Sequence, residues 1–331
     1  MNLPQAFIER TRQLLGETQY LPFEEALQTE VPVSIRPNVL KGAKEVEGEP
    51  VPWASSGWYL KNRPTFTFDP LFHAGYYYVQ EASSMFVEKV LREYVKEPVV
   101  MLDLCAAPGG KSTLCRSVLP EGSLLVANEV MRNRSQILAE NLIKWGHPEV
   151  IVTNNDPADF TDLTYLFDVI LTDVPCSGEG MFRKDQVAVD EWSLENVDIC
   201  WKRQRRILTD IWPTLKPGGL LFIVLARSIG RRTRTMWLGL LKNWVRRYWR
   251  FLRKLDGESL ETSLVRIFPF IVSCLTKPKV KDSSWRFSEN MGPFVMKCRS
   301  VFRKPRHVLT RRKKARMPNN RCHYLRRLKH G

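Results

Sequence analysis

The chain has 331 residues, of which 44% are hydrophobic and 26% are charged, with 18 glycines and 21 prolines. These proportions exclude a disordered, collagen-like or disulfide-stapled chain, and the length predicts about two domains. The formal net charge of +16 favours an anionic partner such as a nucleic acid. Seven cysteines occur without a CxxC pair, which argues against a zinc site and against a disulfide framework.

The charge is unevenly distributed along the chain. Residues 1–221 contain 22 Lys and Arg against 30 Asp and Glu, a net of −8, whereas residues 222–331 contain 29 against 5, a net of +24. A basic tail usually binds nucleic acid. This one also contains four tryptophans among long apolar stretches, which is not the composition of an ordinary tail.

The N-terminus, MNLPQAFIERTRQLLGETQ, contains acidic residues and no continuous apolar core, so we predict no secretory signal. The longest strongly apolar run, residues 218–226, is far shorter than the ~18 residues that cross a bilayer. We therefore expect a cytoplasmic protein with reduced thiols, no transmembrane helix and no membrane partner.

Residues 1–75 predict a small α/β unit. Segments 7–15 and 23–27 have the apolar spacing of helices, and 33–41 alternates like a short strand. After a stretch that contains Pro and Gly, residues 78–95 predict an amphipathic helix. We place the boundary to a second domain, residues 76–225, between 75 and 76, and a basic tail at 226–331.

From residue 99 onward, strands and helices alternate. Strands are expected at 99–105, 124–129, 150–154, 167–173 and 215–224, with helices that begin at Lys111, span 132–145 and run through 203–212. This order predicts an α/β fold with a Rossmann-like parallel sheet that is covered by helices on both faces. Ligands of such sheets collect at the carboxyl ends of the strands.

The first of these strands leads into a glycine turn, DLCAAPGGKST, at residues 103–113. Gly109 and Gly110 would let the backbone approach a ligand closely. The turn is neither GxGxxG nor GxxxxGK, so it favours neither a dinucleotide nor a nucleoside triphosphate. Taken alone, this stretch is also compatible with an ordinary turn between a strand and a helix.

Acidic residues follow four successive strands: Asp103, Glu129, Asp156 and Asp173. An acid after the second strand of such a sheet commonly binds ribose hydroxyls, although a single one is as readily explained by solvation. Four acids at one sheet edge predict a ligand site. Cys176 follows the last of them in TDVPCSGEGMFRK, where nearby Arg183 and Lys184 would favour a nucleophilic or basic thiol. A small buried cysteine is the alternative.

Several segments together resemble the Sun-type RNA cytosine-C5 methyltransferases: LDLCAAPGGKST, NEVM, TDVPCSGEGMFRK, QRRIL and WPTLKPGGLL. VPWASSGWYL and HAGYYYVQEASSM are similar to the bacterial small-subunit rRNA enzymes of the RsmF type. The resemblance covers about residues 1–221. It implies a Rossmann-like methyltransferase domain, an N-terminal unit of the RNA-binding type, S-adenosyl-L-methionine as cofactor and 16S rRNA as partner. It implies no metal and no protein partner.

The resemblance also assigns roles to residues. Glu129 would bind the ribose of the cofactor, Asp156 would lie at its adenine, and Asp173 would lie near the methyl group and the target base. Cys176 would assist loss of the C5 proton and release of the enzyme. The turn would hold the cofactor through Cys105, Ala106, Ala107, Pro108, Gly109, Gly110 and Lys111.

The chain departs from the family where the attacking thiol is expected. In the family, this second cysteine lies in a Tyr-Ser-Thr-Cys-Thr-Phe segment after the Lys-Pro-Gly-Gly strand and adds to C6 of the base. Here the strand continues as FIVLARSIGRRTRTMWL, with Ala226 in the cysteine's place. The sequence contains no cysteine between Cys200 and Cys274. We therefore expect this chain to be catalytically impaired.

The genetic code suggests a cause. If the last base of each codon from Phe222 onward is read with the first two bases of the next, the junctions permit Tyr-Ser-Thr-Cys-Thr-Phe-Asn, with cysteine at the junction of 225 and 226. Acidic codons read one base off also yield arginine, which matches the basic tail. The hypothesis is a frameshift between about residues 219 and 222, with residues 226–331 out of frame.

Three alternatives remain open at this point. The chain could be a noncatalytic protein that binds S-adenosylmethionine and uses its tail to hold RNA. The Trp-rich segment 236–255 could be an RNA- or membrane-binding amphipathic helix. A DNA cytosine methyltransferase would attack with Cys176 itself, and the chain could then be active as it stands.

Overall fold

The computed structural model describes residues 2–43, 46–225, 265–267, 270–271 and 294–296. Its largest element is a six-stranded sheet of order β11-β9-β8-β5-β6-β7, in which every pair of neighbours is parallel. This confirms the predicted Rossmann-like parallel sheet. Its strands are β5 (Val100–Asp103), β6 (Leu124–Asn128), β7 (Val150–Thr153), β8 (Phe167–Asp173), β9 (Leu215–Leu225) and β11 (Phe270–Ile271).

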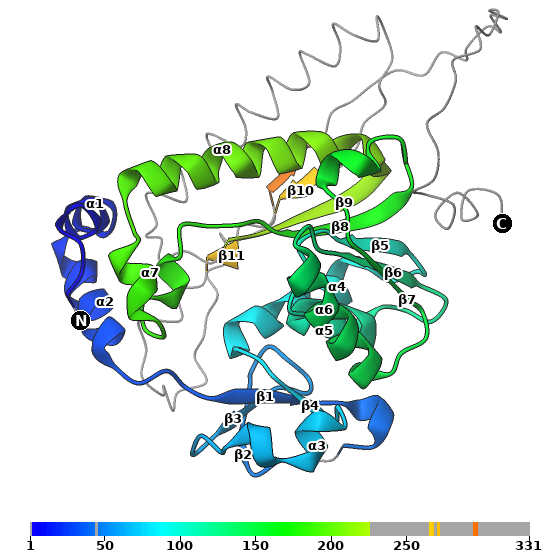
Figure 1. Cartoon of the computed structure of the whole chain (residues 1–331), viewed down its shortest axis with the longest axis horizontal. Helices are drawn as coiled ribbons and strands as arrows, with labels where there is room; N and C mark the ends of the chain where they lie inside the picture. Colours follow the sequence, from blue (N-terminus) through cyan, green and yellow to red (C-terminus); the bar gives the residue numbers. More distant parts are fainter. Residues whose placement is uncertain (1, 44–45, 226–264, 268–269, 272–293, 297–331) are drawn as a thin grey trace, which may run out of the picture.

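Helices cover both faces of this sheet. Helix α8 lies on one side, and α4, α5 and α6 lie on the other (Figure 1). Consecutive strand residues point to opposite faces, so Leu102 joins the apolar cluster under α8 while Met101 joins the cluster under α4 and α5. The helices of this part are α4 (Phe86–Tyr94), α5 (Gly110–Val118), α6 (Arg132–Trp145), α7 (Gln186–Asp190) and α8 (Leu194–Ile211).

The N-terminal part begins with helices α1 and α2 and continues into a four-stranded antiparallel sheet of order β2-β3-β1-β4, with the short helix α3 before β4. Helices α1 and α2 pack against the segment around α7, where Phe7 contacts the rings of Phe182 and Trp192. The sheet lies below α5 and α6 in the view of Figure 1. The bounds are α1 (Gln5–Leu15), α2 (Glu17–Gln28), β1 (Ser34–Pro37), β2 (Gly48–Pro50), β3 (Trp58–Leu60), α3 (Pro70–His73) and β4 (Tyr77–Val79).

Two sequence-based expectations are wrong here. The helix expected over 78–95 begins only at Phe86, because Tyr77–Val79 pairs with β1 as strand β4. The N-terminal sheet therefore extends past residue 75. The strand expected over 33–41 ends at Pro37, and the Asn38 side chain accepts a hydrogen bond from Leu40 N to begin a 3-10 turn.

Short 3-10 turns and two more strands complete the described structure: η1 (Val39–Lys41), η2 (Phe66–Phe68), η3 (Ala82–Met85), η4 (Pro157–Phe160), η5 (Glu179–Met181), η6 (Trp212–Thr214), β10 (Val265–Ile267) and β12 (Phe294–Met296). Ala226 and most of the predicted tail lie outside the described residues. Within the described part of the chain, no helix is both long and apolar enough to cross a membrane.

Candidate cofactor and catalytic site

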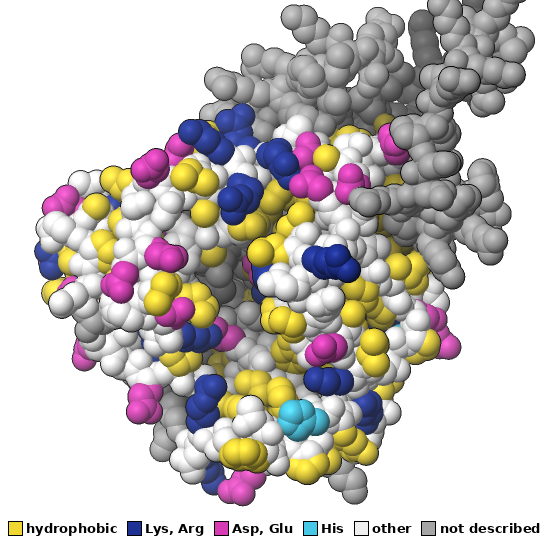
Figure 2. Space-filling model, in the orientation of Figure 1, with side chains coloured by type: hydrophobic (Ala, Val, Ile, Leu, Met, Phe, Trp, Pro, Cys, Tyr) yellow, Lys and Arg dark blue, Asp and Glu magenta, His cyan; other side chains and the backbone are white. Residues whose placement is uncertain are grey.

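The four acids predicted at one sheet edge do lie there. Asp103 ends β5 and Asp173 ends β8, while Glu129 directly follows β6 and Asp156 caps η4 after β7. These strands are parallel neighbours in the order β8-β5-β6-β7, so their carboxyl ends form one row. The space-filling view shows the molecule hollowed between the α1–α2–α7 side and the α5–α6 side (Figure 2).

The glycine turn between β5 and α5 has a backbone that requires glycine. Gly109 has φ +107° and forms the N-cap of α5. A Cβ on Gly110 would lie 3.2 Å from the ring of Tyr78 in β4. Side chains from α6 hold the turn's carbonyls: Arg134 Nη2 donates to Ala107 O (2.9 Å) and Asn141 Nδ2 donates to Pro108 O (2.7 Å). The turn is thus held between side chains of α6 and Tyr78 of β4.

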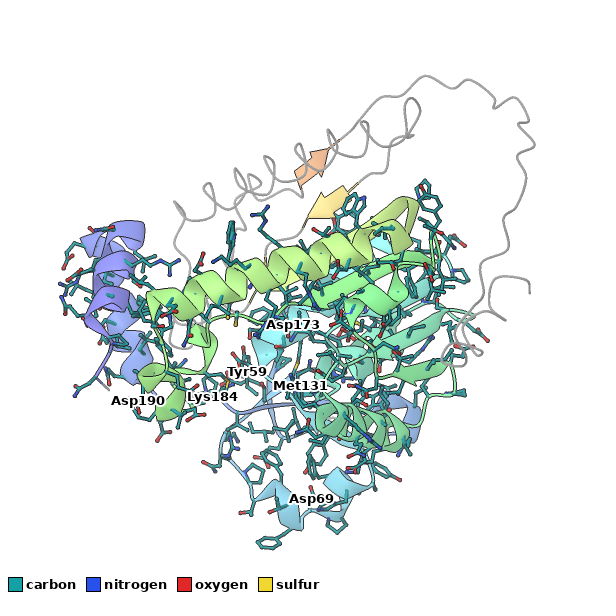
Figure 3. The ribbon with its side chains drawn as sticks, turned by 45° about the horizontal axis from the view of Figure 1, so that its top comes forward. Tyr59, Asp69, Met131, Asp173, Lys184 and Asp190 are labelled. Carbon is teal, nitrogen blue, oxygen red and sulfur yellow. The ribbon has the colours of Figure 1, made fainter. Side chains whose placement is uncertain are left out.

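Lys111, in the first turn of α5, forms an ion pair with Asp173 across the sheet edge, with 2.6 Å between Nζ and Oδ2. Burial alone would lower the pKa of Lys111, but the Asp173 carboxylate outweighs it, and the pKa is raised. Lys111 therefore stays charged at neutral pH. Figure 3 shows Asp173 near the centre of the molecule, at the end of its strand.

Asp103 is fully buried beneath this ion pair. Its Oδ2 accepts a hydrogen bond from Ser112 Oγ at 2.7 Å, whereas its Oδ1 has no partner among the described residues. Burial raises the pKa of Asp103 to about 7. Most buried polar atoms in proteins are hydrogen-bonded, so the Oδ1 atom is an exception.

Glu129 and Asp156 continue the row at the ends of β6 and β7. Glu129 is buried and accepts from Met131 N at 3.0 Å, with Arg134 3.5 Å away. Asp156 is paired with Arg206 of α8 at 2.6 Å. Burial opposes it, but the Ala158 amide and Arg206 together lower the pKa of Asp156. Sequence reasoning missed both arginines, although Arg206 lies within the quoted QRRIL segment.

Cys176 lies in the segment that leaves β8 and is half-buried. Gln204 of α8 donates to the preceding Pro175 O at 2.8 Å, which ties the segment to the helix.

The two cations expected beside the thiol bind the N-terminal part: Arg183 donates to the carbonyls of Thr29 and Glu30, and Lys184 pairs with Glu81. Cys105 is half-buried as well, and burial raises the pKa of its thiol. Among the described residues, no cluster of His, Cys, Asp and Glu could hold a metal ion.

Solved structures share this architecture. The methyltransferase homolog protein from Pyrococcus horikoshii is 30% identical with a TM-score of 0.56, over 66% of this chain and 72% of that one. The structure of NSun6 from Pyrococcus horikoshii with SFG has a TM-score of 0.55 at 19% identity, over 66% and 82%. The fold is therefore that of the Rossmann-like methyltransferases.

Sequence comparisons identify the family within the Rossmann-like methyltransferases. Residues 3–82 match the family described as the N-terminal domain of 16S rRNA methyltransferase RsmF, and residues 91–226 match 16S rRNA methyltransferase RsmB/F. Ribosomal RNA small subunit methyltransferase F of Pectobacterium atrosepticum is 34% identical over 236 residues, which cover 66% of this chain and 49% of the relative. The chain belongs to the RsmB/F family and spans about half the length of the curated relatives it matches.

Proposed function

We propose that the chain binds S-adenosyl-L-methionine and descends from enzymes that methylate C5 of a cytosine in small-subunit rRNA. The observation that carries the proposal is the row of four acids beside the Gly109 turn, with Lys111 paired to Asp173. Family membership supports the substrate class. We further propose that this particular chain is impaired, because Ala226 has no thiol.

The residues present fit the charge of this cofactor, which carries a sulfonium and an ammonium cation. Asp103 places one buried oxygen without a partner at this edge, so a nearby cation would offset its cost. The amides at the N-terminus of α5 suit the cofactor's carboxylate. Glu129 follows β6, where acids commonly bind ribose.

When bound, the cofactor supplies an electrophilic methyl group. Asp173 would hydrogen-bond the target ring as N3 takes up a proton, and Lys111 keeps that carboxylate at the end of β8. Cys176 would assist loss of the C5 proton. Cytosine C5 is a poor nucleophile until a thiolate adds to C6, and Ala226 supplies none. The RsmB/F match ends at residue 226, shortly after the suspected change of frame at about 219–222, and this supports the frameshift.

Calorimetry with S-adenosylmethionine tests the cofactor proposal. We expect the chain to bind it, and we expect Glu129→Ala to weaken binding at least about tenfold, because a hydrogen bond to a charged group contributes about 1.5–3 kcal/mol. Glu140→Ala, on the exposed side of α6, is the matched control and should bind as the original chain does. Absence of binding by the original chain, with no effect of Glu129→Ala, would overturn the proposal.

A tritiated-methyl transfer assay on unmethylated small-subunit rRNA tests the impairment. We expect no methylation by the chain as given and none by Ala226→Cys, since the Tyr, Ser, Thr and Phe around the family's cysteine are still absent. A gene with the alternative frame restored from about codon 221 should methylate the RNA. Methylation by the unaltered chain that is lost in Cys176→Ser would refute this view and identify Cys176 as the attacking group.

A second candidate, a noncatalytic RNA binder, is favoured by one observation, the net charge of +24 in residues 222–331. If that segment is out of frame, it should bind RNA without sequence preference, and binding should weaken steeply with salt because counterions are released. A chain cut after Val224 should then lose the binding. Selective, salt-resistant binding to one rRNA helix that requires residues 225–331 would support the binder.

A further inference from the structure

Arg36 is a buried cation without a carboxylate partner among the described residues. It lies in β1 of the N-terminal sheet and is 0% exposed. Its Nε donates to Gln80 Oε1 (2.9 Å), its Nη2 donates to Thr113 Oγ1 (2.6 Å), and its guanidinium stacks on Trp145 at 4.3 Å. Burial lowers the pKa of Arg36 to about 10, so the group is still charged at neutral pH.

The contacts of Arg36 lead to the glycine turn. Thr113 Oγ1 accepts from Arg36 and lies 2.9 Å from Gly109 O, to which it donates its own hydrogen. Arg36 Nη2 is also 3.4 Å from Gly110 O. The neighbouring strand adds Tyr78, whose hydroxyl donates to Pro108 O at 3.3 Å. Three successive carbonyls of the turn are therefore held by, or through, side chains of β1 and β4.

Apolar packing alone would join the two parts of the molecule at lower cost. A buried charge loses several kcal/mol of hydration, and replacement of buried ionic groups by apolar ones is often neutral or stabilising. The guanidinium differs from an apolar side chain in having several donors at fixed angles. Here Nη2 donates to Thr113 Oγ1, and that hydroxyl donates to the carbonyl of Gly109, whose φ is +107°.

We propose that Arg36 is a positioning residue of the cofactor site, which holds the Gly109–Gly110 turn in its binding conformation through Thr113. The N-terminal sheet then contributes to the cofactor site by positioning this turn. Arg36 itself is fully buried and acts on the turn through Thr113 Oγ1 and Gly110 O. The proposal rests on the proposed function only for the identity of the ligand.

Amide hydrogen exchange of the cofactor-free full chain tests the positioning directly. Thr113→Val removes the hydroxyl but keeps the shape, whereas Thr113→Ser keeps the hydroxyl. In Thr113→Val and Arg36→Met, segment 105–113 should exchange at least about tenfold faster relative to β6, as loss of hydrogen bonds of about 1.5 kcal/mol predicts. Thr113→Ser should exchange as the original chain does.

Arg116→Met is the matched control. Like Arg36, Arg116 is a buried arginine. It lies in the last turn of α5, away from the glycine turn, where it donates to Ser123 O and pairs with Glu149. Its loss should lower stability without accelerating exchange in segment 105–113 relative to β6. Equal acceleration in Arg116→Met and Thr113→Val would mean that the turn responds to general destabilisation, and the proposal would be wrong.

Calorimetry with S-adenosylmethionine then separates the two proposals. If the original chain binds, Thr113→Val should bind about tenfold more weakly and Thr113→Ser normally, with Arg36→Lys between them, since an ammonium can still donate to Thr113. If the original chain does not bind, the proposed function fails, and hydrogen exchange alone decides the role of Arg36. Unchanged exchange in Thr113→Val overturns that role, even if Arg36→Met does not fold.

Discussion

The central sheet and the N-terminal sheet each contain a largely buried strand, but the two strands are buried in different ways. In β5 of the central sheet, Met101 and Leu102 face apolar clusters beneath helices on either side. In β1 of the N-terminal sheet, all four residues are buried, yet they include Ser34 and Arg36, and buried Asn38 follows. The central sheet is held by apolar area, whereas β1 is held by specific polar partners.

The polar side chains that directly follow β1 bind partners outside its own sheet. Asn38 Nδ2 donates to Trp145 O at the end of α6 (2.8 Å) and to Gly75 O (3.0 Å). Lys41 Nζ, just beyond, donates to Lys144 O at 2.6 Å. The N-terminal sheet therefore caps α6 as well as bracing the glycine turn. Burial of polar residues here indicates an interface within the chain rather than a separate core.

The largest expected effect concerns the buried acid of the central sheet. The pKa of Asp103 is raised in the folded state, so the folded protein binds this proton more tightly than the unfolded chain between about pH 4 and 7. The stabilisation from this tighter proton binding is complete below about pH 4 and is lost as the pH rises through 7. The free energy of unfolding should fall by roughly 4 kcal/mol over this range, at 1.36 kcal/mol per pKa unit. Asp103→Asn should remove this loss.

Urea unfolding at pH 4 and pH 8 measures how much stability is lost through ionisation of Asp103. We expect Asp103→Asn to be more stable than the original chain at pH 8 and similar at pH 4. An unchanged pH dependence in the variant would show that Asp103 is ionised in the folded protein without penalty. Asp168→Asn is a suitable control, because Asp168 is partly exposed and paired with Lys216.

A second test compares apolar burial in the two sheets. Leu102→Ala leaves a cavity in the central cluster and should lower the free energy of unfolding by about 3 kcal/mol. Ile35→Ala in β1 should cost less, because Ile35 belongs to no large apolar cluster among the described residues. Equal losses in urea unfolding would contradict the proposed difference between the sheets.

A third test removes a polar anchor of β1. Asn38→Ala leaves the carbonyls of Gly75 and Trp145 without this donor and should cost about 2 kcal/mol. The loss should appear first as faster amide exchange at the end of α6. A change below about 0.5 kcal/mol would mean that water replaces Asn38 at no cost.

The smallest effect is expected at the edge of the N-terminal sheet. Glu47 and Lys61 form an ion pair at 3.0 Å, and both side chains are mostly exposed. Lys61 lowers the pKa of Glu47, but exposed pairs contribute little because water and salt screen them. Glu47→Gln should leave the urea midpoint unchanged within error. A measurable shift would indicate that this edge is more ordered than its exposure implies.

Much of the central sheet could be predicted from the sequence. Residues 132–145 and 167–173 have the bounds of α6 and β8, and the acids at the four strand ends fall in one row. Apolar runs of strand length and the periodic pattern of α6 suffice for this, because the parallel sheet is buried on both faces. The residues expected at the cofactor remain predictions, since no bound ligand tests them.

The N-terminal contacts could not be predicted in the same way. The sequence pattern predicts one amphipathic helix over 78–95. Residues 77–79 instead form strand β4, because they pair with β1, about 40 residues earlier in the chain. Nothing in the sequence distinguishes Arg36 within the segment expected as a strand over 33–41. Its burial depends on Trp145 and Thr113, which lie about 110 and 77 residues further along the chain.

The distance along the chain between β1 and its partners also bears on how the protein is made. Asn38 and Trp145 are 107 residues apart. At about 5–20 residues per second, roughly 5–20 s of synthesis separate them. An apolar strand left without cover for that time is prone to aggregate. Only Ile35 and Pro37 of β1 are apolar, and Ser34, Arg36 and the following Asn38 can stay hydrated until α6 is synthesised. The polar residues of this segment therefore also limit aggregation of the nascent chain.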